Sequence, residues 1–327
     1  MKRAQAGIAL LTAIILVAVA AIVATAIAWQ SELSQRRGIA VFTVTQSLAL
    51  AEGAEAMAGY ALKSSRGTGS TPVSPSQGWA TPYGPVEIDN GAVLEASLED
   101  QAGKFNLNSV VMQGPAANVQ IPGTQQWVIN PTAVAVFTAL LQELNISTDY
   151  AARLVDWIDS DSEPTFPGGA EDSFYLAQQP PLRTPNMLLT SVSELLAMGM
   201  DRDSYNKLAP LVTALPPSVT LNLCTASGYV LDAYAGGGQS SYGLMSAQDL
   251  ASRRQQSACF PDAATFSNGI DPANWAKIQK LVGTSSSYFR LRTWITIGTT
   301  RFTLYSLLYQ GSGTGQVLPI LRTFGTE

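Results

Sequence analysis

Six carboxylate side chains gather within residues 156–172, in a segment that also holds two prolines and the pair Gly168-Gly169. They belong to Asp156, Asp159, Asp161, Glu163, Glu171 and Asp172. The glycine pair lets the chain turn, so that the last two carboxylates return toward Asp159 and Asp161. Carboxylates this close repel one another unless a cation neutralises them, and oxygen ligands without histidine or thiolate favour calcium or magnesium.

The spacing of these carboxylates does not match the EF-hand loop. A solvated acidic loop with helix-capping aspartates explains the same residues equally well. A pair of aspartates could also supply the acid and base of a glycosidase, although clustering within one loop suits a cation better. The residues alone therefore leave the metal site and the acidic loop as open alternatives.

The amino-acid composition excludes several classes of enzyme and of binding partner. The chain of 327 residues contains no histidine, so a Ser-His-Asp triad is excluded, and it contains no Gly-x-Ser-x-Gly nucleophile motif. Its formal net charge of −5 gives no basic surface for nucleic acid. From these features we expect no enzyme and no nucleic-acid partner.

The N-terminus carries the strongest organisational signal. Lys2 and Arg3 precede an uncharged apolar run over residues 8–28, which is long enough to span a bilayer as a helix. A cleaved secretory signal that exits at residues 24–26 or 26–28 and a plain signal anchor both fit this run. So does a class III prepilin leader, in which a peptidase cuts between Gly7 and Ile8 and the apolar run is retained.

The pattern beyond residue 28 favours the prepilin leader. No proline occurs from there until Pro72, and apolar residues recur at helical spacing up to Leu62, which indicates one continuous helix. A cleaved signal needs no such continuation. With the basic residues on the cytoplasmic side, the rest of the chain lies outside the cytoplasm. There Cys224 and Cys259 are expected to form a disulfide, with two separate buried thiols as the alternative.

Two blocks of alternating residues predict strands. The first covers residues 86–108 and the second covers residues 287–325, while the chain between them has helical patterns. Two strands cannot bury a face alone, so we expect both blocks to pair in one sheet that packs on the amphipathic half of the N-terminal helix. The fold class expected is α+β.

Local strings then suggest a family. Residues 99–108 (EDQAGKFNLN), 156–161 (DWIDSD), 169–172 (GAED) and 221–226 (LNLCTA), in this order, resemble the minor pseudopilins of type II secretion, specifically the general secretion pathway protein K family. The resemblance covers essentially the whole chain. It implies a pilin-like fold, a long N-terminal helix packed on an antiparallel sheet, with a large all-helical domain inserted between strands. Cys224 departs from the family, where a polar residue is expected, so the family does not imply the disulfide.

The resemblance also implies a division of the chain. The expected parts are a prepilin leader (1–7), the transmembrane part of the helix (8–28), the first part of the pilin-like domain (29–108), the inserted helical domain (109–283) and the last strands (284–327). In this family calcium is carried by the inserted domain. We therefore expect structural calcium on Asp159, Asp161, Glu171 and Asp172, with Asp156 as an additional candidate.

Thr12 occupies the fifth position counted from Ile8. Most pilin-like subunits carry glutamate there, which neutralises the terminal amine of the subunit above, and the K-type family lacks it. A subunit with nothing above it has no amine to neutralise, and an unpaired carboxylate in the membrane is costly. The residue therefore suits the topmost subunit, although it could be merely a tolerated small residue in a membrane helix.

The function implied by the resemblance is that of a tip subunit. The protein would cap the type II secretion pseudopilus and, with the I-type and J-type minor pseudopilins, start its assembly for protein export across the outer membrane. Prepilin peptidase would cleave after Gly7, Ile8 would be N-methylated, and the chain would cross the bacterial inner membrane once with its C-terminal domain in the periplasm. Contacts with secreted substrates belong to the same expectation. The alternatives are a minor type IV pilin or adhesin, and a signal-anchored periplasmic enzyme.

Overall fold

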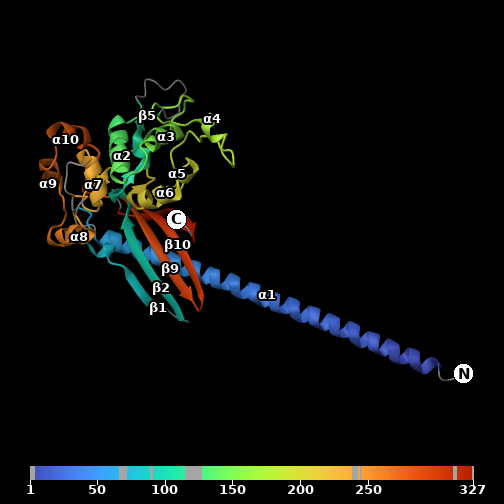
Figure 1. The fold of residues 1–327 in the computed structure, drawn as a ribbon. Coiled ribbons are helices and arrows are strands. Elements are labelled where there is room, and N and C mark those ends of the chain that lie inside the picture. Colours follow the sequence, from blue (N-terminus) through green and yellow to red (C-terminus); the bar gives the residue numbers. More distant parts are fainter. Residues whose placement is uncertain are drawn as a thin grey trace.

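One very long helix dominates the molecule. The computed structural model describes residues 4–65, 72–88, 91–114, 127–237, 242–243, 245–311 and 315–325, with side chains described from residue 8 onward. Helix α1 (Ala4–Ser65) has 62 residues, which corresponds to a length of about 90 Å. Its N-terminal part projects away from the rest of the protein (Figure 1), and from residue 8 onward Ser47 is the first buried residue of the helix. The expected continuous helix is confirmed.

The C-terminal part of α1 lies across a five-stranded antiparallel sheet of order β1-β2-β9-β10-β11. Its strands are β1 (Tyr83–Ile88), β2 (Ala92–Asp100), β9 (Tyr288–Ile297), β10 (Thr300–Gln310) and β11 (Val317–Phe324). β2 pairs directly with β9, from Ala92 opposite Ile297 to Asp100 opposite Phe289. The two strand blocks predicted from the sequence therefore join in one sheet, and the fold class is α+β as expected.

Small residues on α1 allow the helix to approach the sheet closely. Ala51, Ala54 and Ala58 are buried against alternate residues of the sheet strands, among them Leu291 of β9 and Leu304 of β10. This alternation is the period-2 pattern of strands that bury one face. The short 3-10 helix η1 (Gly78–Ala80) adds Trp79 to the same core.

A buried ion pair further fixes α1 to the sheet. Glu55 of α1 is 7% exposed and accepts hydrogen bonds from Ser306 of β10 at 2.5 Å and from Nε of Arg322 of β11 at 2.9 Å. A second guanidinium nitrogen of Arg322 donates to the other carboxylate oxygen. The arginine also lies 3.5 Å from Glu52. The pairing of arginine and carboxylate through two nitrogens is among the stronger ionic contacts in proteins.

The chain between β2 and β9 forms an inserted domain, whose main elements are helices (Figure 1). The α-helices are α2 (Pro131–Glu143), α3 (Asp149–Ile158), α4 (Asp172–Tyr175), α5 (Glu194–Ala197), α6 (Arg202–Leu208), α7 (Gly228–Ala235), α8 (Ala247–Gln256), α9 (Ala263–Asn268) and α10 (Pro272–Ile278). The 3-10 helices are η3 (Gln101–Gly103), η4 (Leu107–Val110) and η6 (Ala209–Leu211). A large apolar core, centred on side chains such as Phe105, Phe137 and Leu154, holds these elements together.

Among the described residues, three short two-stranded sheets accompany the helices, so the inserted domain is mainly helical and the expectation of an all-helical domain is wrong. They pair β3 (Phe105–Asn106) with β6 (Val212–Thr213), β4 (Val111–Gln113) with β5 (Trp127–Ile129), and β7 (Leu221–Asn222) with β8 (Val282–Gly283). Strands of two or three residues are too short to show a period, so sequence patterns do not reveal them.

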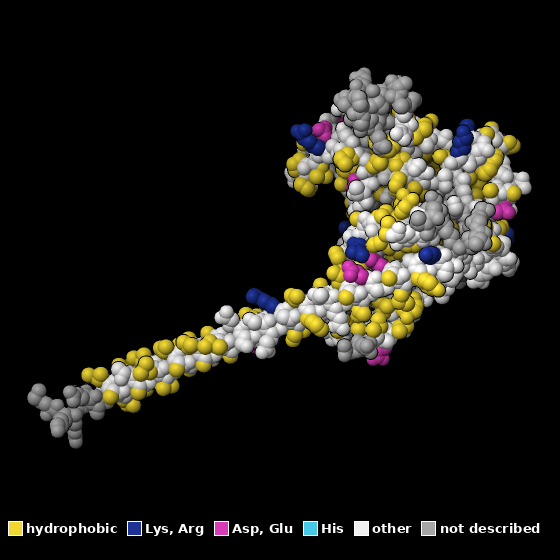
Figure 2. All heavy atoms as spheres, turned by 180° about the vertical axis from the view of Figure 1, so that it is seen from behind, with side chains coloured by type: hydrophobic (Ala, Val, Ile, Leu, Met, Phe, Trp, Pro, Cys, Tyr) yellow, Lys and Arg dark blue, Asp and Glu magenta, His cyan; other side chains and the backbone are white. Residues whose placement is uncertain are grey.

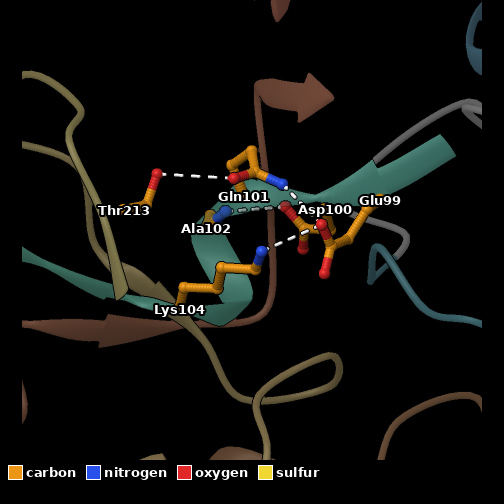
Figure 3. A network of polar contacts seen from close by, with 6 residues as sticks. All are labelled: Glu99, Asp100, Gln101, Ala102, Lys104 and Thr213. Atoms are coloured by element: carbon orange, nitrogen blue, oxygen red, sulfur yellow. Dashed lines mark hydrogen bonds and ion pairs between the residues drawn. The ribbon is translucent and has the colours of Figure 1, made fainter. Parts of the chain in front are cut away.

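A polar network joins the inserted domain to the sheet at the end of β2 (Figure 3). Asp100 accepts hydrogen bonds from the backbone N–H of Ala102 at 2.9 Å, from Asn222 at 2.8 Å and from Thr225 at 2.6 Å. Beside it, the ammonium of Lys104 lies 2.9 Å from the Glu99 carboxylate. Strand β2 ends at Asp100, eight residues before residue 108, where the sequence analysis ended the first part of the pilin-like domain.

Candidate functional site

The acidic segment begins at the end of α3, where one carboxylate organises the loop that follows. Asp156 is fully buried in the helix and accepts hydrogen bonds from the backbone N–H groups of Thr165 at 3.0 Å and Ala170 at 2.7 Å. Burial raises the pKa of this carboxyl, and these hydrogen bonds oppose the rise. Asp156 therefore folds residues 159–170 back onto α3.

Two glycines make this return possible. Gly168 has a φ of +87°, a left-handed conformation that side chains disfavour, and a Cβ there would also collide with Asp149. A Cβ on Gly169 would collide with the Asp156 carboxylate and with the backbone of Thr165. The expected turn at the glycine pair is thus the feature that brings Glu171 back toward the end of α3.

Three of the predicted ligands meet at this point. One carboxylate oxygen from each of Asp159, Asp161 and Glu171 lies within 4.8 Å of the other two. Glu171 is only 3% exposed, Asp159 is partly buried and Asp161 is exposed. The site is therefore a small acidic pit with a buried floor and an open rim.

The floor of the pit contains carboxylate oxygens without hydrogen-bond partners. Oδ1 of Asp159 and Oε1 of Glu171 are both buried, and neither has a donor among the described residues. Such groups are costly to bury. Burial, together with the nearby charges of Asp161, Asp156 and Glu171, raises the pKa of Asp159 to about 7. Burial likewise raises the pKa of Glu171.

This donor set fits a hard divalent cation. Calcium binds oxygen at about 2.3–2.6 Å, so two ligand atoms on opposite sides of the ion lie about 5 Å apart. The mutual distances within 4.8 Å agree with this span. A cation would also supply the missing partner of both buried oxygens. The residues present therefore fit calcium.

The other two predicted ligands lie outside this group of three. Asp172 accepts hydrogen bonds from the backbone N–H of Thr184 at 3.0 Å and from its hydroxyl at 3.1 Å, and lies 3.9 Å from Arg183. Asp156 is engaged by the loop backbone as described above. In this structure both carboxylates hold the chain around the pit.

Sequence reasoning missed two residues beside the pit. The Thr184 hydroxyl lies 3.2 Å from Oε2 of Glu171, so this threonine links both acidic residues at the start of α4. Tyr175 is fully buried, its hydroxyl has no partner among the described residues, and its ring packs edge-on against Trp157 at 5.3 Å. Neither residue carries a motif, because each is brought here only by the folding of the segment.

The two cysteines lie in another part of the inserted domain. Cys224 and Cys259 form a disulfide with a Cα–Cα distance of 4.7 Å. Arg254 of α8 joins the same two segments, since it donates to the carbonyls of Phe260, Leu223 and Ala226. The bridge thus fastens α8 and the turn after it onto the start of α7.

At the opposite end of the molecule, the predicted processing junction between Gly7 and Ile8 lies within the first turns of α1. Residues 1–3 of the predicted leader lie outside the described residues. From residue 8 on, α1 is long and apolar enough to cross a membrane, and an 18-residue window within it has a mean hydropathy of 2.9. The Thr12 hydroxyl donates to the carbonyls of Ile8 at 3.1 Å and Ala9 at 3.0 Å, so it is satisfied by its own helix.

The chain is similar in sequence to proteins of a known family. A family model described as type II secretion system, protein K, matches residues 103–217. The type II secretion system protein K of Pseudomonas aeruginosa is 33% identical over 242 residues, which cover 71% of this chain and 69% of that protein. The chain belongs to the type II secretion system protein K family. The protein K of Pectobacterium carotovorum is 26% identical and aligns over 99% of this chain and 98% of its own length.

A solved structure extends the match to three dimensions. A chain of the GspK-GspI-GspJ complex from the type 2 secretion system of enterotoxigenic Escherichia coli superposes with a TM-score of 0.72 and 25% identity. The match covers 89% of this chain and 100% of that chain. The pilin-like fold with its inserted domain is thereby confirmed, and the protein is a minor pseudopilin of type II secretion.

Proposed function

We propose that this protein K forms the tip of the type II secretion pseudopilus. The observation that carries the proposal is the position of the inserted domain, which lies at the end of the molecule away from the N-terminus of α1 (Figure 1). A further subunit added at that end would collide with this bulk. The protein would therefore act as a structural cap and not as a catalyst.

Thr12 supports the same position. Its hydroxyl donates to carbonyls within α1, so Thr12 needs no contact with the amine of a subunit above. A glutamate there would require such an amine, because an unpaired carboxylate in the membrane is costly. The short side chain suits a helix that ends the assembly.

The partners proposed are the I-type and J-type minor pseudopilins. The similar chain from Escherichia coli was solved in a complex with proteins of those two types. The free part of α1 offers exposed apolar side chains to lipid or to partner helices, including Ile8, Leu10, Leu11, Ile14, Ile15 and Val17. Assembly of these three proteins would start the pseudopilus, and secreted substrates would meet it in the periplasm.

The proposed processing places α1 in the inner membrane. Prepilin peptidase would cut between Gly7 and Ile8, Ile8 would be N-methylated, and the rest of the chain would lie in the periplasm. Intact-mass measurement of the protein from its native membrane tests this step. Loss of residues 1–7 together with one methyl group supports it, whereas cleavage near Ala28 or an intact N-terminus contradicts it.

The acidic pit would hold structural calcium. Asp159, Asp161 and Glu171 would bind the ion, while Asp156 and Asp172 would shape the loop around it. The bound ion would neutralise the three carboxylates and tie α4 to the end of α3. The support is the pair of buried oxygens, one on Asp159 and one on Glu171, that have no hydrogen-bond partner among the described residues.

Labelling of assembled filaments tests the cap directly. Pseudopili are assembled in cells that express the full-length protein with a C-terminal epitope, and gold-labelled antibody is located by electron microscopy. The proposal expects label at one end of each filament. Label spread along the sides would contradict it. A Thr12→Glu variant tests the tip marker separately from the inserted domain, and we expect fewer labelled ends because an unpaired carboxylate in the membrane is costly.

The alternative functions predict different outcomes. A minor type IV pilin would be expected to keep glutamate at the position of Thr12 and to lack the large insertion, and family membership favours the pseudopilin instead. A periplasmic enzyme would show a hydrolytic activity that is lost when the acidic loop is altered.

A further inference from the structure

A small apolar cavity lies between α1 and the corner formed by η1, β1 and β2. Its volume is about 160 Å³, and its walls include Ala58 and Ala61 of α1, Trp79, Tyr83 and Leu98. It lies at the junction of the two apolar clusters that hold α1 on the sheet. Every described residue that lines it is uncharged.

The cavity exists because alanines stand where larger side chains would fill the space. Ala54, Ala58 and Ala61 face it from α1, and Ala96 faces it from β2. Unfilled apolar space in a core lowers stability, because the surrounding side chains lose contacts. A cavity retained at this cost, and open to the surface, is a candidate binding site.

The size and the rim of the cavity indicate what it accepts. An apolar cavity of about 150 Å³ holds a benzene ring, so this one fits a single aromatic or branched aliphatic side chain. Two large side chains that line it are partly exposed: Met57 is 49% exposed and Tyr83 is 43% exposed. Figure 2 shows hydrophobic side chains along the projecting part of the same helix. A buried apolar anchor with exposed apolar residues around it is typical of a protein interface.

The position of the cavity excludes a lipid chain. Ala54 follows the last residue of the apolar run by 26 residues, which amounts to about 39 Å of helix. An acyl chain in the bilayer cannot reach that distance from the membrane. The occupant must therefore come from a polypeptide that lies beside the membrane-distal half of α1.

We propose that this cavity receives one large apolar side chain of a neighbouring I-type or J-type pseudopilin. The inference rests on the partnership set out under the proposed function and specifies where on the chain it is made. The cavity lies on the same helix as the exposed apolar residues Ile39, Val41 and Phe42, which follow the membrane span.

A pair of matched substitutions on α1 tests the proposal. Ala61→Leu places a leucine in the cavity, whereas Ala56→Leu places the same side chain on an exposed part of the same helix that does not line it. Both full-length variants are prepared in detergent, and their affinity for the full-length I-type and J-type proteins of the same system is measured. The proposal expects Ala61→Leu to weaken binding at least tenfold and Ala56→Leu to change it less than twofold.

Three outcomes decide the matter. If the unaltered chain binds the partners and Ala61→Leu binds equally well, the cavity is not the site, although the partnership stands. Equal weakening by both variants also overturns the proposal, because it points to the helix surface in general. Failure of the unaltered chain to bind either partner removes both the inference and the partnership on which it rests.

A second measurement covers the case in which Ala61→Leu fails to fold. A photo-cross-linking phenylalanine derivative replaces Tyr83 at the rim of the cavity, and the full-length protein is irradiated in the mixture with both partners. The proposal expects a cross-link to the I-type or J-type chain. A cross-link only to a second copy of this protein, or only to lipid, overturns it.

Discussion

Two buried glutamates, one beside the sheet and one in the inserted domain, differ in how their negative charge is neutralised. Glu55, on the side of α1 that faces the sheet, is 7% exposed and is held by Arg322 and Ser306. Glu171, at the acidic pit, is 3% exposed, and one of its oxygens has no donor among the described residues. Its neighbours are two further carboxylates instead of an arginine.

In the first region the buried charge is paired with residues of the same chain, whereas in the second region the proposed calcium ion would neutralise it. The joint between α1 and the sheet balances its buried charge with residues of the same chain. The pit leaves buried carboxylate oxygens without a hydrogen-bond donor among the described residues, and a bound cation would satisfy them. The stability of the contact between α1 and the sheet should therefore not depend on calcium, while the stability of the inserted domain should.

Removal of calcium should have the largest effect. An ion present at a thousand times its dissociation constant stabilises the folded state by about 4 kcal/mol, which corresponds to a fall in Tm of about 10 °C after chelation. Differential scanning calorimetry of the full-length protein, with excess calcium and with chelator, measures this shift. The Glu171→Gln variant is the control and should show little response. Identical thermal transitions of the unaltered protein with calcium and with chelator would contradict the metal assignment.

Disruption of the joint between α1 and the sheet should come next. Arg322→Met leaves Glu55 buried without its cation, and we expect the free energy of unfolding to fall by about 2 kcal/mol. This loss is smaller than that for a fully buried ion pair, because the arginine is partly exposed. Denaturant unfolding measures the loss. The double variant with Glu55→Gln should recover part of it, and the loss should be the same with and without calcium. A loss that disappears on chelation would contradict the separation of the two regions.

The response to pH sharpens the same contrast. Without an ion, the raised pKa of Asp159, about 7, means that the folded state binds more protons than the unfolded state between about pH 4 and 7. The stability of the ion-free protein should therefore fall as pH rises through this window. Bound calcium keeps the carboxylates charged in the folded state, so the slope should largely disappear above about pH 5. Thermal melts from pH 4.5 to 7.5 test this, and Asp159→Asn should flatten the ion-free curve.

The smallest effect should come from the exposed ligand. Asp161→Asn removes one charge at the rim of the pit, and we expect calcium affinity to fall about tenfold, equivalent to about 1.4 kcal/mol. Glu163→Gln changes an exposed carboxylate of the same loop that lies outside the group of three, and should leave affinity unchanged. Isothermal titration with calcium compares the two variants. Equal losses would show that general loop charge, and not a defined site, controls binding.

The parts of the structure that the sequence could predict have local or repeating signals. The long apolar helix and the alternating strands at 288–297 and 300–310 follow from residue types at regular spacing, and the acidic loop follows from a local cluster of carboxylates. Glu171 returns to Asp159 because glycine at 168 and 169 allows it, and that turn is also a local signal.

The parts that could not be predicted depend on contacts between distant segments. Arg322 meets Glu55 across 267 residues, and Asn222 meets Asp100 across 122 residues. No spacing rule connects such positions. Thr184 and Tyr175 beside the pit were missed for the same reason, and the two-residue strands of the inserted domain have no period to detect.

The most direct test of the calcium assignment is the position of the ion itself. Crystals of the protein grown with calcium, measured at a wavelength where calcium scatters anomalously, would locate it in a difference map. We expect a peak bounded by carboxylate oxygens of Asp159, Asp161 and Glu171. A map without a peak at that point, or with an ordered ion only elsewhere in the protein, would contradict the assignment.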